Sequence, residues 1–406
     1  YCTDSNISNW GTVSFLPVAQ EESAVAVREK KVNTEGVRVY LAKFITRTLR
    51  RTIVMKKTKN LSIIVALTVF ICLLAAGCSS GKKQTVSETK MITITDSSER
   101  TVEVPCPPER IVVCNSYVAE VICVLEEEDR IIGASKVVLE YPILDQKLKG
   151  IKDVGDVFNP SVEKILTLDP DIVIGWTTQE QDITNQLQQA GIPVVLLDCS
   201  KTDVLSRDIK VIGKILGREK RASQFIAYYE KYQEMIGTRL KGVPDEKKPQ
   251  VYWEGMSDYN TVGPGSSDGN MLVAAGGRNI AGEVPLSSTK VSPEWVLVKN
   301  PEIVIKCPGT AKVPSGYGIN ADAMKKQREE IIVRSELKQI KAFKTDKVYV
   351  LSRRAVSGPQ SIIGLMYVAK WLHPELFEDV NPEKIHQEML EKFYGLEYQG
   401  AWAYPI

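Results

Sequence analysis

A long amphipathic stretch near the middle of the chain constrains the fold more than any other feature. From Phe225 to Leu240, apolar and aromatic side chains recur at steps of three and four residues among Glu, Lys, Arg and Gln. That period is typical of a helix that buries one face. The segment 242–249 follows, and its prolines and charged residues end the pattern. We therefore expect one helix over Glu219–Leu240 that divides the chain into two globular parts.

Short apolar runs alternate with helical patterns on both sides of this helix. The runs are brief and rich in β-branched residues, which is typical of strands buried on both faces of a parallel sheet. The sequence therefore predicts an α/β fold with two Rossmann-like lobes joined by a single long α-helix. We place the N-terminal lobe at 91–217, the connecting helix at 218–248 and the C-terminal lobe at 249–406.

Each lobe should contain several strands and helices. An edge hairpin is expected over 91–104. The expected strands are 110–114, 130–134, 171–176 and 194–198 in the first lobe, and 250–253, 303–306 and 347–351 in the second. The expected helices are 118–126, 161–168 and 180–190 in the first lobe, and 270–275, 293–298, 329–340 and 361–372 in the second.

The segment from Met55 to Cys78 has the parts of an export signal in their usual order. Lysines precede a weakly polar to apolar stretch over 61–77, which is short for a membrane span of about 20 residues, and small residues follow. The end of this segment, Leu74 to Cys78, resembles the lipobox of bacterial lipoproteins. We interpret 55–77 as a lipoprotein signal peptide, Cys78 as the lipidated residue and 78–90 as a flexible tether. An uncleaved membrane anchor is the alternative.

Residues 1–54 fit no part of this signal, because an export signal acts at an N-terminus. We interpret them as an over-extended reading frame, with a disordered cytoplasmic extension as the alternative. The expected location of the protein is therefore extracytoplasmic, with a lipid anchor in the cell membrane.

The charge balance and the cysteine spacing exclude other classes. Lys and Arg number 52 against 50 Asp and Glu, which leaves a formal net charge of +2 in 406 residues. Such a chain has no general field for holding a polyanion, so we expect no nucleic-acid partner. The 8 cysteines are too dilute for a disulfide scaffold, and no C-x-x-C pair indicates a zinc or redox site.

Two similar modules occur, one in each lobe. Ser161 and Ser292 are good helix caps, and each is followed two residues later by a glutamate, Glu163 or Glu294. A carboxylate in the first turn of a helix is kept charged by the helix dipole. An apolar stripe and then Asp-Pro-Asp or Asn-Pro-Glu end each helix before a buried strand. Taken alone, each glutamate is equally well explained as a good first-turn residue.

Together these features resemble the class III periplasmic binding proteins of ABC importers, which take up ferric siderophores, haem and cobalamin. The resemblance covers about 91–396 and lies in five stretches: 107–113, 159–166 running into 169–174, 275–280, 291–297 and 300–305. It implies a monomeric binding protein that is not an enzyme, needs no cofactor and delivers its ligand to a permease and its ATPase. It also implies that Glu163 and Glu294 dock on arginines of the permease.

The strand ends supply candidates for the ligand site. Ligands of open α/β sheets gather beyond the carboxyl ends of the strands, and in a two-lobed protein both sets of ends face the cleft. Aromatic faces and guanidinium groups suit a flat chelate with negative charge. Ordinary packing is the alternative for each residue taken alone. The candidates by this rule are Tyr117, Trp176, Trp253, Tyr259, Arg353 and Arg354.

Several alternatives stay open at this point. Cys114, Cys199 and Cys307 also follow strands, where they either bind a soft metal or simply pack as small apolar residues, and packing is the stronger interpretation. The stretch Gly265–Gly269 matches the hydrolase pattern G-x-S-x-G, with Ser267 as nucleophile, but Gly-Pro-Gly stands where a strand is required. A ligand sensor without a permease is a third class.

The cargo is ranked by what the protein must supply to it. Haem needs an axial ligand, usually His, Met, Tyr or Cys, and both histidines, His373 and His386, lie in a charged C-terminal helical region that places them poorly for the cleft. A siderophore already fills the coordination sphere of its iron, and cobalamin carries its own corrin. We therefore rank a ferric chelate first, cobalamin second and haem last.

Overall fold

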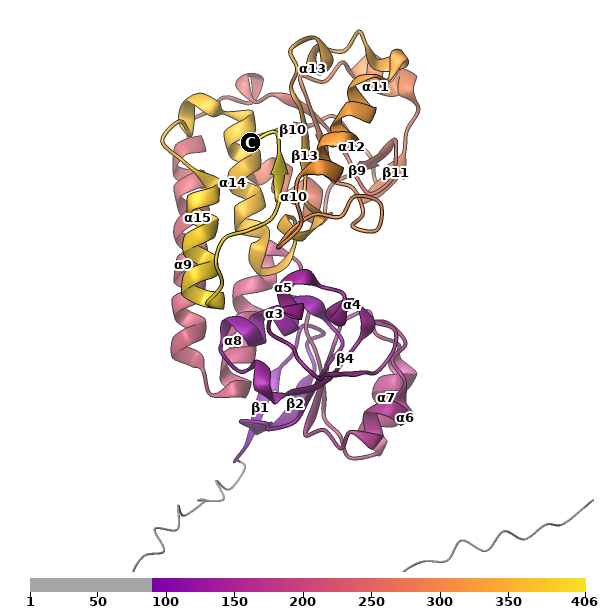
Figure 1. The fold of residues 1–406 in the computed structure, drawn as a ribbon, viewed down its shortest axis with the longest axis vertical. Coiled ribbons are helices and arrows are strands. Elements are labelled where there is room, and N and C mark those ends of the chain that lie inside the picture. Colours follow the sequence, from indigo (N-terminus) through magenta and orange to yellow (C-terminus); the bar gives the residue numbers. More distant parts are fainter. Residues whose placement is uncertain (1–89) are drawn as a thin grey trace, which may run out of the picture. The chain divides into compact units, whose positions relative to one another are not determined.

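The computed structural model describes residues 90–406, in which the two larger β-sheets are separated in sequence by the long helix α9, Glu219–Leu240 (Figure 1). We call the elements before α9 lobe 1 and those from β8 onward lobe 2. The predicted two-lobed α/β fold is confirmed, and α9 has the predicted bounds. The lobe boundaries given above, and the N-terminal segments before residue 78, stay predictions, and 1–89 lie outside the described residues.

Lobe 1 is built on a parallel sheet of five strands in the order β5-β4-β3-β6-β7. Helices cover both faces, so all three residues of the central strand β3 are buried: Ile111 and Val113 lie in one core and Val112 in the other. This double burial is what the short β-branched runs predict. The strands are β3 Ile111–Val113, β4 Ile131–Ala134, β5 Lys152–Asp153, β6 Ile172–Gly175 and β7 Val194–Leu196.

The helices of lobe 1 follow the expected strand and helix alternation. They are α3 Ser116–Val124, α4 Lys136–Leu139, α5 Pro142–Asp145, α6 Val162–Thr167, α7 Gln181–Gln189 and α8 Thr202–Leu216, with a 3₁₀ turn η1 at Glu128–Arg130. The predicted hairpin is present as the antiparallel pair β1 Lys90–Thr95 and β2 Thr101–Cys106. Helix α8 was not among the expected helices, and it ends where Gly217 adopts a left-handed conformation with φ 66°.

Lobe 2 contains a mixed sheet in the order β11-β9-β8-β12-β13-β14, with β10 also paired to β8. The pairs among β8, β12 and β13 are parallel, whereas β9, β11 and β14 pair antiparallel. The strands are β8 Gln250–Glu254, β9 Asn260–Val262, β10 Arg278–Asn279, β11 Ser288–Lys290, β12 Ile303–Lys306, β13 Val348–Leu351 and β14 Ala403–Tyr404. The carboxyl ends of β8, β12 and β13 therefore lie together at one edge of the sheet.

The helices of lobe 2 include one that the sequence misplaces. They are α10 Ser267–Ala274, α11 Pro293–Lys299, α12 Asp322–Ile332, α13 Lys341–Lys344, α14 Ser361–Leu372 and α15 Pro382–Met389, which continues as a π-helical turn, η7 Leu390–Tyr394. The remaining 3₁₀ turns are η2 Asp245–Lys247, η3 Ser335–Leu337, η4 Arg353–Ala355, η5 Gly358–Gln360 and η6 Pro374–Leu376.

The helix predicted at 329–340 instead ends at Ile332. Arg334 leaves the helix with extended backbone, and its guanidinium pairs with Glu254 at 2.8 and 3.1 Å. A tertiary ion pair thus overrides the local helical pattern.

Helix α9 packs against both lobes, on α8 and on α14. Its buried face consists of the aromatic and apolar stripe that the sequence shows, including Phe225, Tyr229 and Ile236. The hydroxyl of Tyr229 lies 2.7 Å from the Ser361 hydroxyl at the start of α14. At 1.5 Å per residue a helix of 22 residues is about 33 Å long. The two lobes are therefore held along one continuous element.

Candidate functional site between the two lobes

The first turn of α3 carries Tyr117 to a contact with lobe 2. The Asn115 side chain caps this helix by accepting hydrogen bonds from the backbone of Tyr117 and Val118. Gly358 of η5 packs directly against the Tyr117 ring: a Cβ at Gly358 would lie 2.3 Å from Tyr117 Cδ1. Gly358 also has φ +72°, and its backbone donates to Ser200 O at 3.2 Å. No other residue fits this contact between the lobes without a shift.

Trp176 extends the aromatic surface of lobe 1 at the end of β6. Its ring meets Tyr117 edge to face, with ring centroids 5.7 Å apart, and lies 6.2 Å from Phe158. Phe158 is 48% exposed, so this cluster faces solvent on one side. The two rings are brought together, and the ligand contact that the sequence predicts for Tyr117 and Trp176 stays a prediction.

The two adjacent arginines of η4 have different environments. Arg353 forms a bidentate pair with Asp268 of α10 at 2.6 and 2.9 Å and donates to Cys307 O at 3.2 Å. Burial would lower the pKa of Arg353, but the charge of Asp268 and neighbouring groups raise it above its usual value. Its guanidinium is therefore occupied by the protein itself.

Arg354 lies over the ring of Tyr141 from lobe 1, with its guanidinium carbon 4.0 Å from the ring centroid. Within residues 90–406 no acceptor bonds to its Nε, and no carboxylate pairs with its guanidinium within salt-bridge distance. Cation–π contact holds the side chain while leaving its N–H groups unpaired. Of the two arginines, Arg354 has free capacity for an anion.

A buried carboxylate lies beside this arginine. Glu120 of α3 is fully buried and accepts hydrogen bonds from Tyr141 Oη at 3.1 Å, and from Gln360 Nε2 and Tyr394 Oη at 2.7 Å each. Burial raises the pKa of Glu120, and these donors and the charge of Arg354 oppose that rise. Because Gln360 and Tyr394 belong to lobe 2, Glu120 joins the lobes at the base of the site.

His386 completes this network from α15. Its Nε2 lies 2.7 Å from Gln360 Oε1, and burial lowers the pKa of His386 to about 3, so the imidazole is neutral. The Gln360 amide is thereby fixed with its NH₂ toward Glu120. Glu120, Gln360 and Tyr141 were not among the predicted site residues. The one signal for Glu120 is a lone carboxylate within the apolar run 118–125.

Two predicted ligand residues lie elsewhere. Trp253 is 0% exposed and packs within the main core, so its ring presents no face to an open cleft. This burial does not support the predicted ligand contact of Trp253, which stays a prediction. Tyr259 donates to Glu336 Oε1 at 2.6 Å, and Arg334 lies 4.8 Å over its ring. Tyr259 therefore belongs to a cluster around η3 rather than to the group around Tyr117.

Gln179 is a further polar group at the end of β6 that the sequence did not single out. It is 6% exposed, and neither Oε1 nor Nε2 has a hydrogen-bond partner among the described residues.

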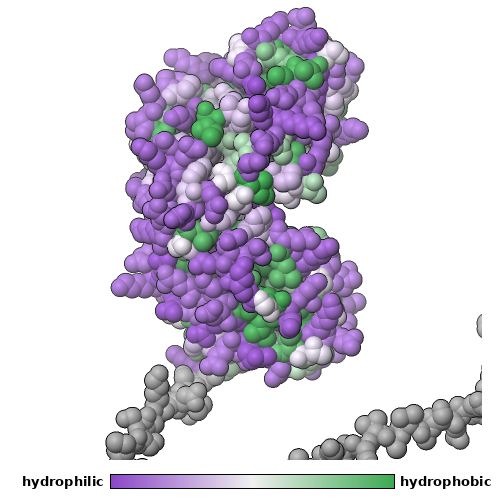
Figure 2. Space-filling view, viewed as in Figure 1, coloured by the Kyte–Doolittle hydropathy of each residue, from purple (hydrophilic) through white to green (hydrophobic). Residues whose placement is uncertain are grey.

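The space-filling view shows the surface hollowed between the lobes on the side away from α9 (Figure 2).

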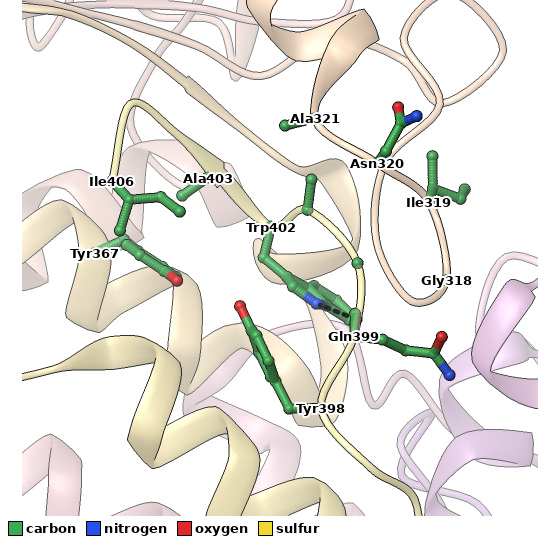
Figure 3. A pocket seen from close by; sticks show the side chains of 12 residues that line it. Gly318, Ile319, Asn320, Ala321, Tyr367, Tyr398, Gln399, Trp402, Ala403 and Ile406 are labelled. Atoms are coloured by element: carbon green, nitrogen blue, oxygen red, sulfur yellow. Dashed lines mark hydrogen bonds between the residues drawn. The ribbon is translucent and has the colours of Figure 1, made fainter.

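A separate cavity of about 320 Å³ lies within lobe 2 (Figure 3). The loop 318–321, Tyr367 of α14 and the segment 398–403 line it, and the Tyr398 and Trp402 rings face it. No residue of lobe 1 contributes to this lining. The cavity is therefore distinct from the meeting place of the lobes.

The structure shows the surroundings of the three candidate cysteines and of the Gly265–Gly269 stretch. Cys114 and Cys307 are buried thiols whose pKa burial raises to about 12, and burial also raises the pKa of Cys199. In residues 90–406 no cluster of three or more His, Cys, Asp or Glu side chains is arranged to hold a metal ion. These cysteines pack as apolar residues. Ser266 caps α10 through the Gly269 amide, and the neighbouring Asp268 is bound by Arg353.

The two glutamates predicted for docking occupy equivalent positions. Glu163 lies in the first turn of α6, where Ser161 accepts from the Lys164 amide, and Glu294 lies in the first turn of α11, where Ser292 accepts from the Trp295 amide. A hydrogen bond from Ser292 and one from its own backbone lower the pKa of Glu294. Both carboxylates are exposed. Their docking role stays a prediction.

The segment interpreted as an export signal, with Cys78, lies outside the described residues. Among the helices that the structure describes, none combines the length and apolar character of a membrane span.

The chain belongs to the periplasmic binding protein family, whose profile matches residues 111–355. The molybdate-binding protein MolA of Haemophilus influenzae is 24% identical over 75% of this chain and 92% of its own length. The solved structure of MolA bound to molybdate has the same fold, with a TM-score of 0.65 at 23% identity over 76% of this chain and 99% of that one.

Two further relatives carry other cargo names. A cobalamin-binding protein of Halobacterium salinarum is 24% identical over 66% of this chain and 70% of its own length. The iron(3+)-hydroxamate-binding protein FhuD of Bacillus subtilis is 28% identical over 58% of this chain and 71% of its own length. The protein is thus a substrate-binding protein of an ABC transporter, works outside the cytoplasm with a permease, and is not an enzyme.

Proposed function

We propose that the protein captures an anionic metal chelate, a ferric siderophore in the first place, at the junction of its two lobes and delivers it to the permease. The observation that carries this proposal is the Arg354 guanidinium, which lies on the Tyr141 ring without an anionic partner in the described chain. An unpaired, half-buried guanidinium is suited to a carboxylate or catecholate oxygen. The relation to FhuD supports the same cargo class.

The aromatic side of the site would cover the apolar part of the chelate. Tyr117 and Trp176 form an edge-to-face pair that is open toward Phe158. The protein need not supply a ligand to the iron, since the siderophore does so.

Cobalamin is the second candidate, because the same aromatic surface could cover a corrin edge and a relative is named for that cargo. Haem is disfavoured: His373 and His386 are both buried and bonded within lobe 2, to Gly276 O and to Gln360 respectively. Neither imidazole is free to bind an iron in the junction.

Tryptophan fluorescence tests the cargo directly. Purified protein is titrated with a ferric hydroxamate, a ferric catecholate, cyanocobalamin, haemin and molybdate. We expect ferric chelates to quench the emission of Trp176, and Trp176→Phe to remove most of the quenching while leaving binding by equilibrium dialysis. Saturable binding of cobalamin alone, or of molybdate alone, would replace the siderophore by that cargo.

Delivery and anchoring are parts of the same proposal. Glu163 and Glu294 would dock on basic side chains of the permease, and acylated Cys78 would hold the protein at the membrane. Glu163→Arg combined with Glu294→Arg should abolish uptake while ligand affinity stays intact. Unchanged uptake would refute the docking role, and a normal ligand response in a cell without any permease would favour a sensor. Loss of membrane retention in Cys78→Ala tests the anchor.

A further inference from the structure

Helices α6 and α11 share more than their glutamates. Leu166 follows Glu163 by three residues, and Leu297 follows Glu294 by three residues. Residues three apart lie on the same face of a helix, so each glutamate has a leucine beside it. Both leucines are exposed, Leu166 to 42% and Leu297 to 38%. The same carboxylate and leucine pair is thus presented once by each lobe.

These leucines are not needed to hold their helices in place. The residue before each of them, Ile165 in α6 and Val296 in α11, is fully buried and anchors the helix to its core. A single exposed leucine on a protein surface needs no explanation. Its recurrence at the same position of both modules, next to the same charge, indicates a shared role.

The apolar surface is more extended in lobe 2. Val298 follows Leu297 and is 83% exposed, and Val333, in the segment before η3 that packs on α11, is 69% exposed. The space-filling view shows apolar surface over the region of α11 and α13 (Figure 2). In Figure 1, α6 and α11 both lie on the side of their lobes turned away from α9.

We propose that Leu166 and Leu297 form, with Glu163 and Glu294, a two-point contact surface for the membrane permease of the importer. At each point the permease would present a basic side chain beside an apolar recess. This inference rests on the docking role proposed above and adds to it. A solvent-exposed ion pair contributes little affinity by itself, whereas an apolar contact beside it excludes water and strengthens it.

The arrangement also describes the partner. Because one pair occurs in each lobe, the partner must offer the same contact twice, as a membrane protein with two equivalent halves does. A bilayer surface fits less well, since anionic lipids would repel the carboxylate on the same face as each leucine. A second copy of this chain would set glutamate against glutamate in a symmetric contact.

The test compares leucine variants with matched exposed residues. Protein carrying Leu166→Ser and Leu297→Ser is measured for binding to the cognate permease–ATPase complex in nanodiscs, with empty nanodiscs as reference. Losing two buried leucine contacts should raise the Kd roughly tenfold to a hundredfold. The affinity for the ferric chelate should not change. The control is Met91→Ser with Val273→Ser, one residue per lobe, 49% and 64% exposed and outside α6 and α11.

The outcomes separate this inference from the function on which it rests. If Glu163→Arg with Glu294→Arg leaves binding to the complex unchanged, the docking role itself is wrong. If those changes abolish binding while the leucine variant behaves like its control, only the leucine surface is wrong. Equal loss of binding to empty nanodiscs, or loss of self-association in sedimentation, would assign the leucines to the bilayer or to a second copy and overturn the inference.

Discussion

The two lobes share one module on their outer side and differ at the strand ends that face each other. In lobe 1, Tyr117 in the first turn of α3 and Trp176 directly after β6 form an aromatic pair. Lobe 2 ends β8 and β12 with Glu254 and Lys306, which are both buried and paired at 2.8 Å. In the proposed function, the matching modules of the two lobes serve one docking surface twice, whereas the strand ends that face each other differ in chemistry.

For the ligand site proposed above, this difference would give the two lobes different parts in binding. Most cations at the strand ends of lobe 2 are neutralised within the lobe: Lys306 and Arg334 by Glu254, and Arg353 by Asp268. Arg354 remains, and it lies on an aromatic ring of lobe 1. Apolar contact from lobe 1 and charge from lobe 2 therefore meet only at the junction.

The largest effect is expected from breaking the buried ion pair of lobe 2. Glu254→Gln removes the nearer carboxylate of the fully buried Lys306 and leaves only Asp258, at 3.4 Å, so it should lower the free energy of unfolding by about 3 to 5 kcal/mol. Urea denaturation measures it. The exposed pair Lys136 and Glu140 is the control, since Glu140→Gln should cost less than about 0.5 kcal/mol. Similar losses for the two variants would show that lobe 2 does not depend on its buried charges.

The contact between the lobes is expected to be next in size. Gly358 has a left-handed backbone, and a Cβ added there would lie 2.3 Å from Tyr117 Cδ1. Gly358→Ala should therefore lower the free energy of unfolding by about 2 to 3 kcal/mol. Gly150→Ala has nearly the same φ, +70°, but meets no atom within 4 Å. It should cost only about 1 kcal/mol. If Gly358→Ala and Gly150→Ala lost the same stability in thermal or urea unfolding, the Tyr117 ring would not constrain Gly358.

The adjacent arginines should separate ligand affinity from stability. Arg354→Gln should weaken binding of an anionic ferric chelate by roughly tenfold to a hundredfold, because a charge-assisted contact is lost. Arg353→Gln leaves the buried Asp268 unpaired and should mainly reduce stability, by about 1 to 3 kcal/mol. Fluorescence titration and urea denaturation of both variants measure this. The reverse pattern would contradict the assignment of Arg354 to the ligand.

The smallest effect concerns pH. Burial would raise the pKa of Glu254, but Arg334 and Lys306 hold it below its ordinary value of 4.5. The ionised Glu254 carboxylate therefore contributes its full stabilisation above pH 4.5. This contribution is lost as the pH falls through the pKa of Glu254 in the folded protein, which lies below 4.5. Wild-type protein should lose stability from this pair below pH 4.5, and Glu254→Gln should show a shallower acid dependence. If wild type and Glu254→Gln lost stability in parallel as the pH falls, Glu254 would not be a cause of the acid dependence.

The local sequence pattern was sufficient to predict the elements whose buried residues recur at a regular spacing. The stripe from Phe225 to Leu240 predicts α9 with its observed bounds, and the apolar run at 361–372 does the same for α14. The caps Ser161 and Ser292 are also predicted, since the signal lies within four residues. Such features depend on neighbours in the sequence.

The failures come from contacts between distant parts of the chain. The helix expected at 329–340 is cut short because Arg334 pairs with Glu254, 80 residues away. The sequence places Arg353 and Arg354 directly after β13. Only the fold shows that Arg353 forms an ion pair with Asp268 and that Arg354 lies over the ring of Tyr141. The strand-end rule also gives no information on burial, and the structure shows that Trp253 at the end of β8 is fully buried.

A structure of the protein with a bound ferric siderophore tests the central claim most directly. We predict that the chelate lies between the lobes, with an aromatic contact to Tyr117 or Trp176 and an anionic oxygen within hydrogen-bond distance of the Arg354 guanidinium. A chelate bound in the lobe 2 cavity beside Tyr398 and Trp402, or on the outer face of either lobe, would contradict it.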